Sequence, residues 1–345
     1  MRIRKQGFTR QGFIQRGFPM KYGLMLPSRG PLAGPESLSA IAKRAEELGY
    51  HVLMFPDHIV MPKQTDSQYP YSESGIFPGT DNNETMEQLT TLAFLAGQTK
   101  SIRLVTSVMI VPHRPPVLTA KILSTIDILS QGRMNVGVGV GWLKEEFEAL
   151  QTPPFEERGA ITDEYILAFK ELWTKDEPSF QGKYCQFSNI NFLPKPVQKP
   201  HPPIWVGGES RQAIRRAAEL GDAWQPIATS SSSPLTTPEQ LAEGISRLGR
   251  YTERAGRPPG SVEIVCRMPG YNLKSEDGRS SGAEGRDRPV FNGTADDIAS
   301  DIRRYEEMGV GHIVASFVPV GHVANSTEEM LTDMEDFANR VIPRV

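Results

Sequence analysis

The stretch KYGLMLPSRGPLAGPESLSAIAKRAEELG, residues 21–49, combines the two patterns that decide the fold. Residues 21–27 form a short apolar run typical of a buried strand. In residues 37–49 the apolar side chains recur at helical spacing, and the segment ends in a glycine, a common signal at the end of a helix. The stretch therefore predicts one strand followed by one helix.

The same unit recurs along the rest of the chain. We expect strands at 21–27, 51–58, 102–112, 134–142, 202–208, 223–227, 261–268 and 312–319. These runs are rich in Val and Ile and lack a polar face, as in a parallel sheet that is covered on both sides. Eight strand–helix units predict an α/β fold, a closed (β/α)8 TIM barrel at 20–345 with insertions after strands 2, 4 and 7. Residues 181–192 read as a hairpin within the second insertion.

Composition and charge argue against several classes of function. The 345 residues carry 38 basic and 41 acidic side chains, and this balance favours neither nucleic acid nor an anionic membrane as a partner. No segment approaches the ~20 apolar residues that span a bilayer. Two cysteines, Cys185 and Cys266, make no disulfide framework, and no metal-ligand spacing such as His-Glu-x-x-His occurs. We expect a cytoplasmic protein without a metal site.

Residues 1–19 differ from the rest of the chain, because they contain five basic residues and no acidic one. They lack the apolar core of a secretory signal. We expect a disordered basic extension that precedes the folded domain. A basic arm that binds RNA or directs targeting is the alternative.

Glycines alternate along the fourth expected strand, at Gly137, Gly139 and Gly141. The spacing is not the dinucleotide-binding fingerprint, because Trp142 stands where the third glycine of that motif is needed. Alternate residues of a strand face one side, so these glycines point into the barrel. We interpret Gly139 and Gly141 as clearance for a flat ring at the carboxyl end of the strand, and Gly137 as part of a packing layer.

A second glycine pair follows strand five. Gly207 and Gly208 precede Glu209, Ser210 and the helical segment RQAIRRAAELG. Backbone N–H groups at the start of a helix favour a phosphate, and the catalytic face of a barrel is the place for one. A plain tight turn is the alternative. Three arginines lie on the first turns of this helix: Arg211, Arg215 and Arg216.

Asp57 and His58 end the second strand, on the face where TIM barrels carry their chemistry. A histidine gives or takes a proton near neutral pH, and a neighbouring carboxylate can orient its ring. The pair therefore predicts acid–base catalysis, with a strand-end cap as the alternative. His113, shortly after strand three, is a weaker candidate.

Several ordered segments resemble the luciferase-like monooxygenase superfamily, in particular its branch of oxidoreductases that depend on the deazaflavin coenzyme F420. They are AEELGYHVLMFPDH, IRLVTSVMIVPHRPP, LSQGRMNVGVGVGWLKEEFEAL, ERGAITDEYILAFKELW and KPVQKPHPPIWVGGESRQAIRRAAELGDAWQP. The resemblance implies a TIM barrel with a flavin or 5-deazaflavin ring across its mouth and the phosphate tail running outward.

The resemblance also implies roles for individual residues. His58 corresponds to the active-site histidine of the family and Asp57 to its acidic neighbour, which also contacts the cofactor. Ser107–Val108 corresponds to a bulge with a non-prolyl cis peptide bond that supports the ring. The implied cofactor contacts are Asp57, Thr106, Ser107, Val108, Gly139, Val140, Gly141, Gly207, Gly208, Glu209 and Ser210.

The substrate is expected over the barrel mouth. Trp142 and Trp224 stand at strand ends, where they flank a pocket or pack in the core. The segment 60–85 is too long for a simple turn and carries Tyr69 and Tyr71, as a substrate lid does; a surface insertion or a subunit contact is the alternative.

We expect hydride transfer between reduced F420 and a small organic substrate, with His58 relaying a proton. The alternative is a monooxygenase that uses FMNH2 and O₂ and depends on a separate flavin reductase. A barrel that binds a cofactor or ligand without turnover is a third possibility. The resemblance also favours a homodimer, and a reductase of flavin or F420 as a further partner.

Overall fold

The computed structural model describes residues 20–72, 74–77, 84–227, 230, 233–268, 270–274, 288–317 and 326–345. The expected basic extension at 1–19 lies outside these residues. Within the described part, no helix combines the length and the apolar character needed to cross a membrane.

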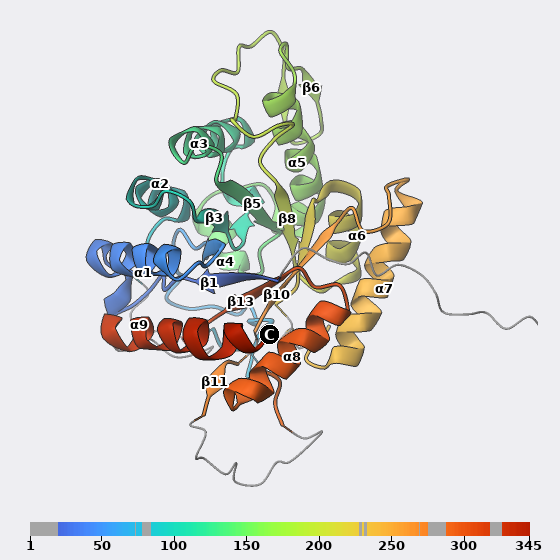
Figure 1. The fold of residues 1–345 in the computed structure, drawn as a ribbon. Coiled ribbons are helices and arrows are strands. Elements are labelled where there is room, and N and C mark those ends of the chain that lie inside the picture. The colour runs from blue at the N-terminus through green and yellow to red at the C-terminus, as the bar shows by residue number, and fades with distance from the viewer. Residues whose placement is uncertain are drawn as a thin grey trace, which may run out of the picture.

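A closed parallel barrel forms the centre of the molecule (Figure 1). Its strands are β1 (Lys21–Met25), β2 (Val52–Phe55), β3 (Arg103–Thr106) with its continuation β4 (Met109–Ile110), β5 (Met134–Gly139), β8 (Ile204–Gly207), β9 (Ala223–Gln225), β10 (Glu263–Arg267) and β13 (His312–Ala315). The order β3-β2-β1-β13-β10-β9-β8-β5-β4, with a further pairing of β3 and β5, closes the ring. The predicted (β/α)8 barrel is confirmed.

Helices surround the barrel (Figure 1). They are α1 (Pro35–Glu47), α2 (Gln88–Gln98), α3 (Pro116–Leu129), α4 (Lys144–Ala149), α5 (Arg158–Thr174), α6 (Arg211–Leu220), α7 (Pro238–Arg254), α8 (Ala295–Glu307) and α9 (Thr327–Asp336). Short helical turns are η1 (Pro31–Ala33), η2 (Val111–His113), η3 (Phe155–Glu157), η4 (Phe337–Val341) and η5 (Ile342–Arg344).

Strand residues alternate between two cores, as the period of a strand requires. In β2, Val52 and Met54 belong to a small cluster inside the barrel, whereas Leu53 and Phe55 belong to the large cluster between the barrel and the helices. Burial on both sides explains why the strands read as continuous apolar runs.

The three predicted insertions are present. The first lies between β2 and α2, and the second contains α4, η3 and the antiparallel pair β6 (Phe180–Gln181) and β7 (Gln186–Phe187), which is the expected hairpin. The third contains the short strands β11 (Asn272–Leu273) and β12 (Asn292–Gly293). The first insertion and the start of the second meet at the carboxyl ends of β2 and β5, because Glu145 accepts the N–H groups of Asp66 and Ser67.

Candidate active site

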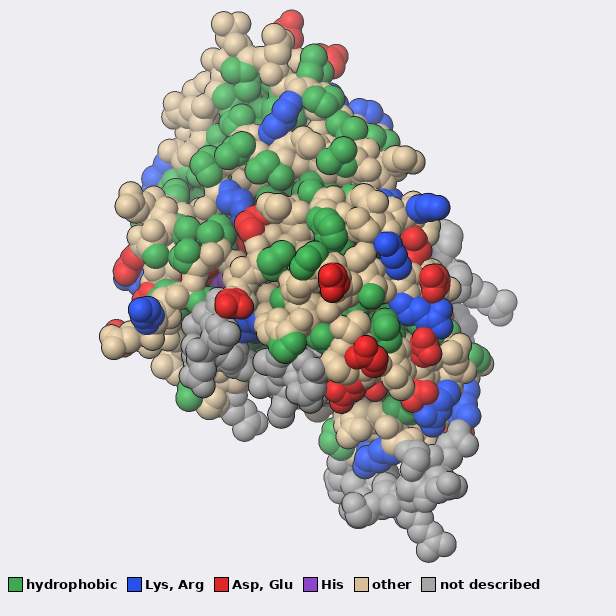
Figure 2. Space-filling model, turned by 90° about the vertical axis from the view of Figure 1, so that its left-hand side faces the viewer, with side chains coloured by type: hydrophobic (Ala, Val, Ile, Leu, Met, Phe, Trp, Pro, Cys, Tyr) green, Lys and Arg blue, Asp and Glu red, His purple; other side chains and the backbone are tan. Residues whose placement is uncertain are grey.

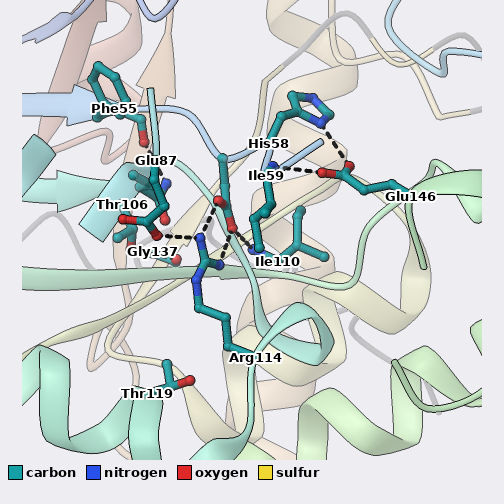
Figure 3. Close-up of polar contacts among 12 residues, drawn as sticks. Phe55, His58, Ile59, Glu87, Thr106, Ile110, Arg114, Thr119, Gly137 and Glu146 are labelled. Carbon is teal, nitrogen blue, oxygen red and sulfur yellow. Dashed lines mark hydrogen bonds and ion pairs between the residues drawn. The ribbon is translucent and has the colours of Figure 1, made fainter. Parts of the chain in front are cut away.

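His58 lies at the carboxyl end of β2 and is paired with a carboxylate from the helix that follows β5. Its Nδ1 is 2.9 Å from Oε2 of Glu146 on α4 (Figure 3). Oε1 of the same carboxylate accepts the backbone N–H of Ile59 at 2.8 Å. The Glu146 side chain is only 1% exposed, and a buried carboxylate needs such partners. The pair is an oriented histidine–carboxylate dyad.

Asp57 does not orient His58, although the two are neighbours in the chain. Its carboxylate binds both terminal nitrogens of Arg114 at 2.8 Å and accepts the N–H of Ile110 at 2.9 Å. Arg114 also binds Glu87 at 2.7 Å (Figure 3). The expected pairing of Asp57 with His58 is therefore wrong, because the Asp57 side chain points into a buried ion pair that fastens β4 to the end of β2.

The ion pair also sets the charge of Asp57. Burial alone would raise the pKa of this carboxyl group, but Arg114 and the N–H of Ile110 outweigh the burial and hold the pKa below its ordinary value. Asp57 is consequently an anion at neutral pH.

The third strand is interrupted between β3 and β4 by a cis peptide bond at Ser107–Val108, as the family resemblance implies. The N–H of Ser107 donates to the Phe55 carbonyl at 2.8 Å, and its hydroxyl accepts Nε2 of Gln225 at 2.7 Å. Thr106 Oγ1 donates to the Gly137 carbonyl at 2.7 Å. Hydrogen bonds to β2, β5 and β9 thus hold this bulge in place.

Gly137, Gly139 and Gly141 lie where other residues of the protein approach the chain closely. A Cβ atom at Gly137 would lie 1.8 Å from the Thr106 carbonyl oxygen, so this position belongs to the packing layer as expected. A Cβ at Gly139 would lie 2.5 Å from a methyl group of Val108, and one at Gly141 would lie 2.7 Å from Phe147. Gly139 and Gly141 thus give room to Val108 and Phe147, and their role as clearance for a ring stays a prediction.

Val108 is held between two strands. A Cβ at Gly207, at the end of β8, would lie 2.6 Å from the other Val108 methyl group, so the side chain occupies a notch formed by Gly139 and Gly207. Val140 and Gly141 follow Gly139 at the mouth and remain partly exposed.

The loop at Gly207–Ser210 has the backbone of a helix-starting turn. Gly208 has a φ of +108°, a conformation that favours glycine. The Ser210 side chain caps α6 by accepting the N–H of Ala213 at 3.1 Å. Glu209 is buried, and its carboxylate accepts the N–H of Ile227. The loop thus offers a capped helix start, and Glu209 supplies a structural bond within it.

The three arginines of α6 do not act together at this loop. Arg216 is buried and binds the Asp163 carboxylate and the Gly159 carbonyl. Arg215 lies 3.8 Å from both Asp163 and Glu219, whereas Arg211 is exposed. The Arg216 guanidinium therefore joins α6 to α5.

Aromatic side chains of the first insertion gather around His58. Phe77 lies 5.0 Å from the imidazole between ring centroids, Tyr69 lies 4.9 Å from Phe77, and Tyr71 lies 5.5 Å from Tyr69. Trp142 completes the cluster at 5.1 Å from Tyr69 and 6.4 Å from His58. The structure thus brings Tyr69, Tyr71 and Trp142 together beside the dyad.

Trp224 lies elsewhere. It is fully buried, its Nε1 donates to the Gly208 carbonyl at 2.8 Å, and its ring fills the space beside Gly244. These contacts match the packing alternative for this residue.

His113 lies on η2, buried edge-on to Phe147 at 4.8 Å, and neither ring nitrogen has a hydrogen-bond partner in the described part. Burial lowers its pKa, and the nearby carboxylates of Glu146 and Asp57 offset this only in part. Among the described residues, no group of three His, Cys, Asp or Glu side chains is placed to hold a metal ion.

Three residues at this site were not identified from the sequence: Glu146, Arg114 and Gln225. Glu146 lies in the charged run KEEF, where a glutamate normally faces solvent. Its position four residues after Trp142, at the mouth of a barrel, was the available signal. Arg114 and Gln225 follow or end apolar strands, which is also where a barrel places functional side chains.

Comparison with known proteins places these features in a family. The luciferase-like monooxygenase model matches residues 20–277. An uncharacterised protein of Mycobacterium tuberculosis is 30% identical over 309 residues, which cover 88% of this chain and 94% of that protein. The FMNH(2)-dependent dimethylsulfone monooxygenase of Pseudomonas putida is 31% identical over 207 residues, 59% of this chain and 55% of that protein.

A solved structure extends the comparison to the fold. An F420-dependent secondary alcohol dehydrogenase in complex with an F420-acetone adduct superimposes with a TM-score of 0.71 at 17% identity, covering 95% of this chain and all of that one. The chain therefore belongs to the luciferase-like monooxygenase family, whose members are flavin- or F420-dependent oxidoreductases and monooxygenases.

Proposed function

We propose that this protein transfers a hydride between reduced coenzyme F420 and a small organic substrate, with His58 moving a proton. The observation that supports this most directly is the His58–Glu146 dyad, at 2.9 Å, beside an aromatic cluster at the catalytic end of the barrel. The FMNH2-dependent alternative uses the same residues, so the two candidates differ in the cofactor and in the need for O₂.

The residues present fit a flavin-type cofactor. The Ser107–Val108 bulge is held from three sides, and Val108 fills a notch between Gly139 and Gly207, which together make a firm support at the mouth. Gly208, with its positive φ, leads into the start of α6, where N–H groups and the helix dipole favour a phosphate. When bound, the reduced cofactor would supply the hydride, or in the alternative the reducing power for oxygen transfer.

The protein's own contribution is control of one proton. Glu146 accepts a hydrogen bond from Nδ1 of His58, which fixes the tautomer and leaves Nε2 to exchange a proton with a substrate. The imidazole is 14% exposed, so few water molecules compete for that nitrogen. Tyr69, Phe77 and Trp142 form an apolar wall around it.

A second candidate is an FMNH2-dependent monooxygenase with a separate flavin reductase. The similarity to the dimethylsulfone monooxygenase favours it, at 31% identity over 207 residues. The dyad favours an enzyme over a barrel that binds without turnover, because a carboxylate that orients an imidazole is an arrangement suited to proton transfer.

Quenching of cofactor fluorescence on binding distinguishes the F420-dependent candidate from the FMNH2-dependent one. We expect F420 to bind more tightly than FMN, and turnover of an identified substrate to proceed without O₂. Tighter binding of FMN with O₂-dependent turnover would establish the second candidate. Binding of neither cofactor would overturn both.

A homodimer in the cytoplasm is also part of the proposal. Large hydrophobic side chains are exposed on neighbouring helices: Phe94 on α2, Leu118 and Leu129 on α3, and Leu167 on α5. Figure 2 shows hydrophobic side chains gathered over the upper part of the face that includes α2 and α3. Light scattering after size-exclusion chromatography tests this, and a monomer at micromolar concentration would contradict it.

A further inference from the structure

Arg267 ends strand β10 at the barrel mouth, and the site described so far gives it no role. Its Nε is buried and has no hydrogen-bond partner among the described residues. A buried polar atom without a hydrogen-bond partner is rare, and leaving one unsatisfied costs stability. A missing ligand is one of the few explanations for such a group.

The surroundings of Arg267 belong to the first insertion and to the loop at Gly207–Ser210. Electrostatic interactions join it to Tyr69, Tyr71 and Glu209. Tyr69 also interacts with Arg29, which follows β1 and lies 4.4 Å above the Phe77 ring. The guanidinium groups of Arg267 and Arg29 therefore both act on this cluster, as does the carboxylate of Glu209, which also accepts the N–H of Ile227.

The buried charge of Arg267 is only partly compensated by the described neighbours. Burial lowers the pKa of Arg267, and the two tyrosines and Glu209 offset this only in part. Burial also raises the pKa of Tyr69 and of Tyr71, so both hydroxyls stay protonated and can donate hydrogen bonds. A cationic fork beside hydroxyl donors is complementary to a carboxylate or a sulfonate.

The cluster is continuous with the dyad. Tyr69 contacts Phe77 at 4.9 Å, and Phe77 contacts His58 at 5.0 Å, so two ring contacts connect the arginine side of the mouth with the imidazole. A small molecule with its reacting group at His58 can reach toward Arg267 along this aromatic wall.

We propose that Arg267, with Arg29 and the hydroxyls of Tyr69 and Tyr71, forms a subsite for an anionic group, a carboxylate or sulfonate, on the substrate. The inference rests on the proposed function and narrows its substrate class. Arg267 and Arg29 are specificity-determining residues, because they hold a part of the substrate that does not react.

Binding of a matched pair of probes tests the subsite without turnover. Benzoate and benzamide share size and shape, but only benzoate carries a charge. In calorimetric titration of the full-length protein, we expect benzoate to bind at least tenfold more tightly than benzamide, and inorganic sulfate to compete with it. Equal binding of the two probes, or no competition by sulfate, would overturn the inference.

Variants test whether Arg267 is responsible for the preference for benzoate. Arg267→Met should weaken benzoate binding at least tenfold and leave benzamide binding unchanged, whereas Arg250→Met, on the outer helix α7, should change neither. Without ligand, Arg267→Met should raise Tm by a few degrees, since it removes a buried guanidinium whose Nε has no hydrogen-bond partner in the described part. A merely structural arginine would lower Tm instead. If Arg267→Met does not fold, Arg29→Met should show the same selective loss of benzoate.

The two proposals fail separately. Quenching of F420 and FMN fluorescence on the same preparation reports the cofactor site. Cofactor binding without preference for benzoate overturns only the anionic subsite. Benzoate binding without binding of either cofactor overturns the proposed function and leaves the subsite standing.

Discussion

Nδ1 of His58, at the end of β2, lies 2.9 Å from Oε2 of Glu146, on the short helix that follows β5. Oε1 of that carboxylate accepts the N–H of Ile59, so both oxygens are bound by the segment that carries the histidine. Two segments far apart in the chain are thus joined at the carboxyl ends of the strands, and in the proposed function this contact determines which ring nitrogen meets a substrate.

Replacement of the carboxylate should therefore impair chemistry more than binding. We expect Glu146→Gln to lower kcat by about 10²–10⁴-fold, the usual contribution of general acid–base catalysis, with little change in KM. Glu148→Gln, on the same helix, is the control and should keep full activity. Steady-state kinetics on an identified substrate measure the effect.

The dyad also predicts non-additivity. Once His58→Gln has removed the imidazole, adding Glu146→Gln should lower kcat by less than threefold more, because the carboxylate acts through the histidine. Multiplicative losses in the double variant would show that Glu146 acts on its own.

Breaking the ion pair between Asp57 and Arg114 should lower the stability of the protein. Asp57→Asn leaves the Arg114 guanidinium with Glu87 alone and should reduce the free energy of unfolding at pH 7 by about 3–5 kcal/mol, as for other broken buried pairs. Urea unfolding measures it, with the exposed Asp176→Asn as the control.

The same ion pair should make the free energy of unfolding depend on pH. The pKa of Asp57 is lowered by folding, so its stabilisation is present above the unfolded value of about 3.9 and is lost as the pH falls through the folded value. The difference between wild type and Asp57→Asn should consequently narrow below about pH 4. A constant difference down to pH 3 would contradict the assignment.

The barrel and much of its mouth were predictable from the sequence, because strand burial on both faces leaves a pattern that local composition records. The cis bond at Ser107–Val108 was also expected, but only from the family resemblance. Glu146 was not found, since its burial depends on a contact with the distant His58. Gly137 was correctly predicted as part of a packing layer, whereas the contact of Gly139 with Val108 became visible only in three dimensions.

A larger side chain in the notch that Gly139 and Gly207 form for Val108 should disturb the packing. Gly139→Ala would place a Cβ 2.5 Å from the Val108 methyl group and should destabilise the protein by about 1–3 kcal/mol. Gly249→Ala, in α7 with nothing within 4 Å, should instead stabilise it by about 0.5–1 kcal/mol. Adding Val108→Ala to Gly139→Ala should restore part of the loss, and no recovery would show that the clash lies elsewhere.

Substitutions in the loop before α6 should separate the effect of backbone strain from the effect on cofactor binding. Gly208 has a φ of +108° and precedes the helix start proposed to hold a phosphate, whereas Gly256 has a φ of +70° and follows α7. Alanine is strained at both positions, so both variants should lose stability. Gly208→Ala alone should weaken F420 or FMN binding, by at least tenfold, since it displaces the N–H groups that face the phosphate. Equal affinity for the cofactor in the two variants, measured by fluorescence quenching, would show that this loop does not bind the phosphate. The cofactor tail would then be held by other residues.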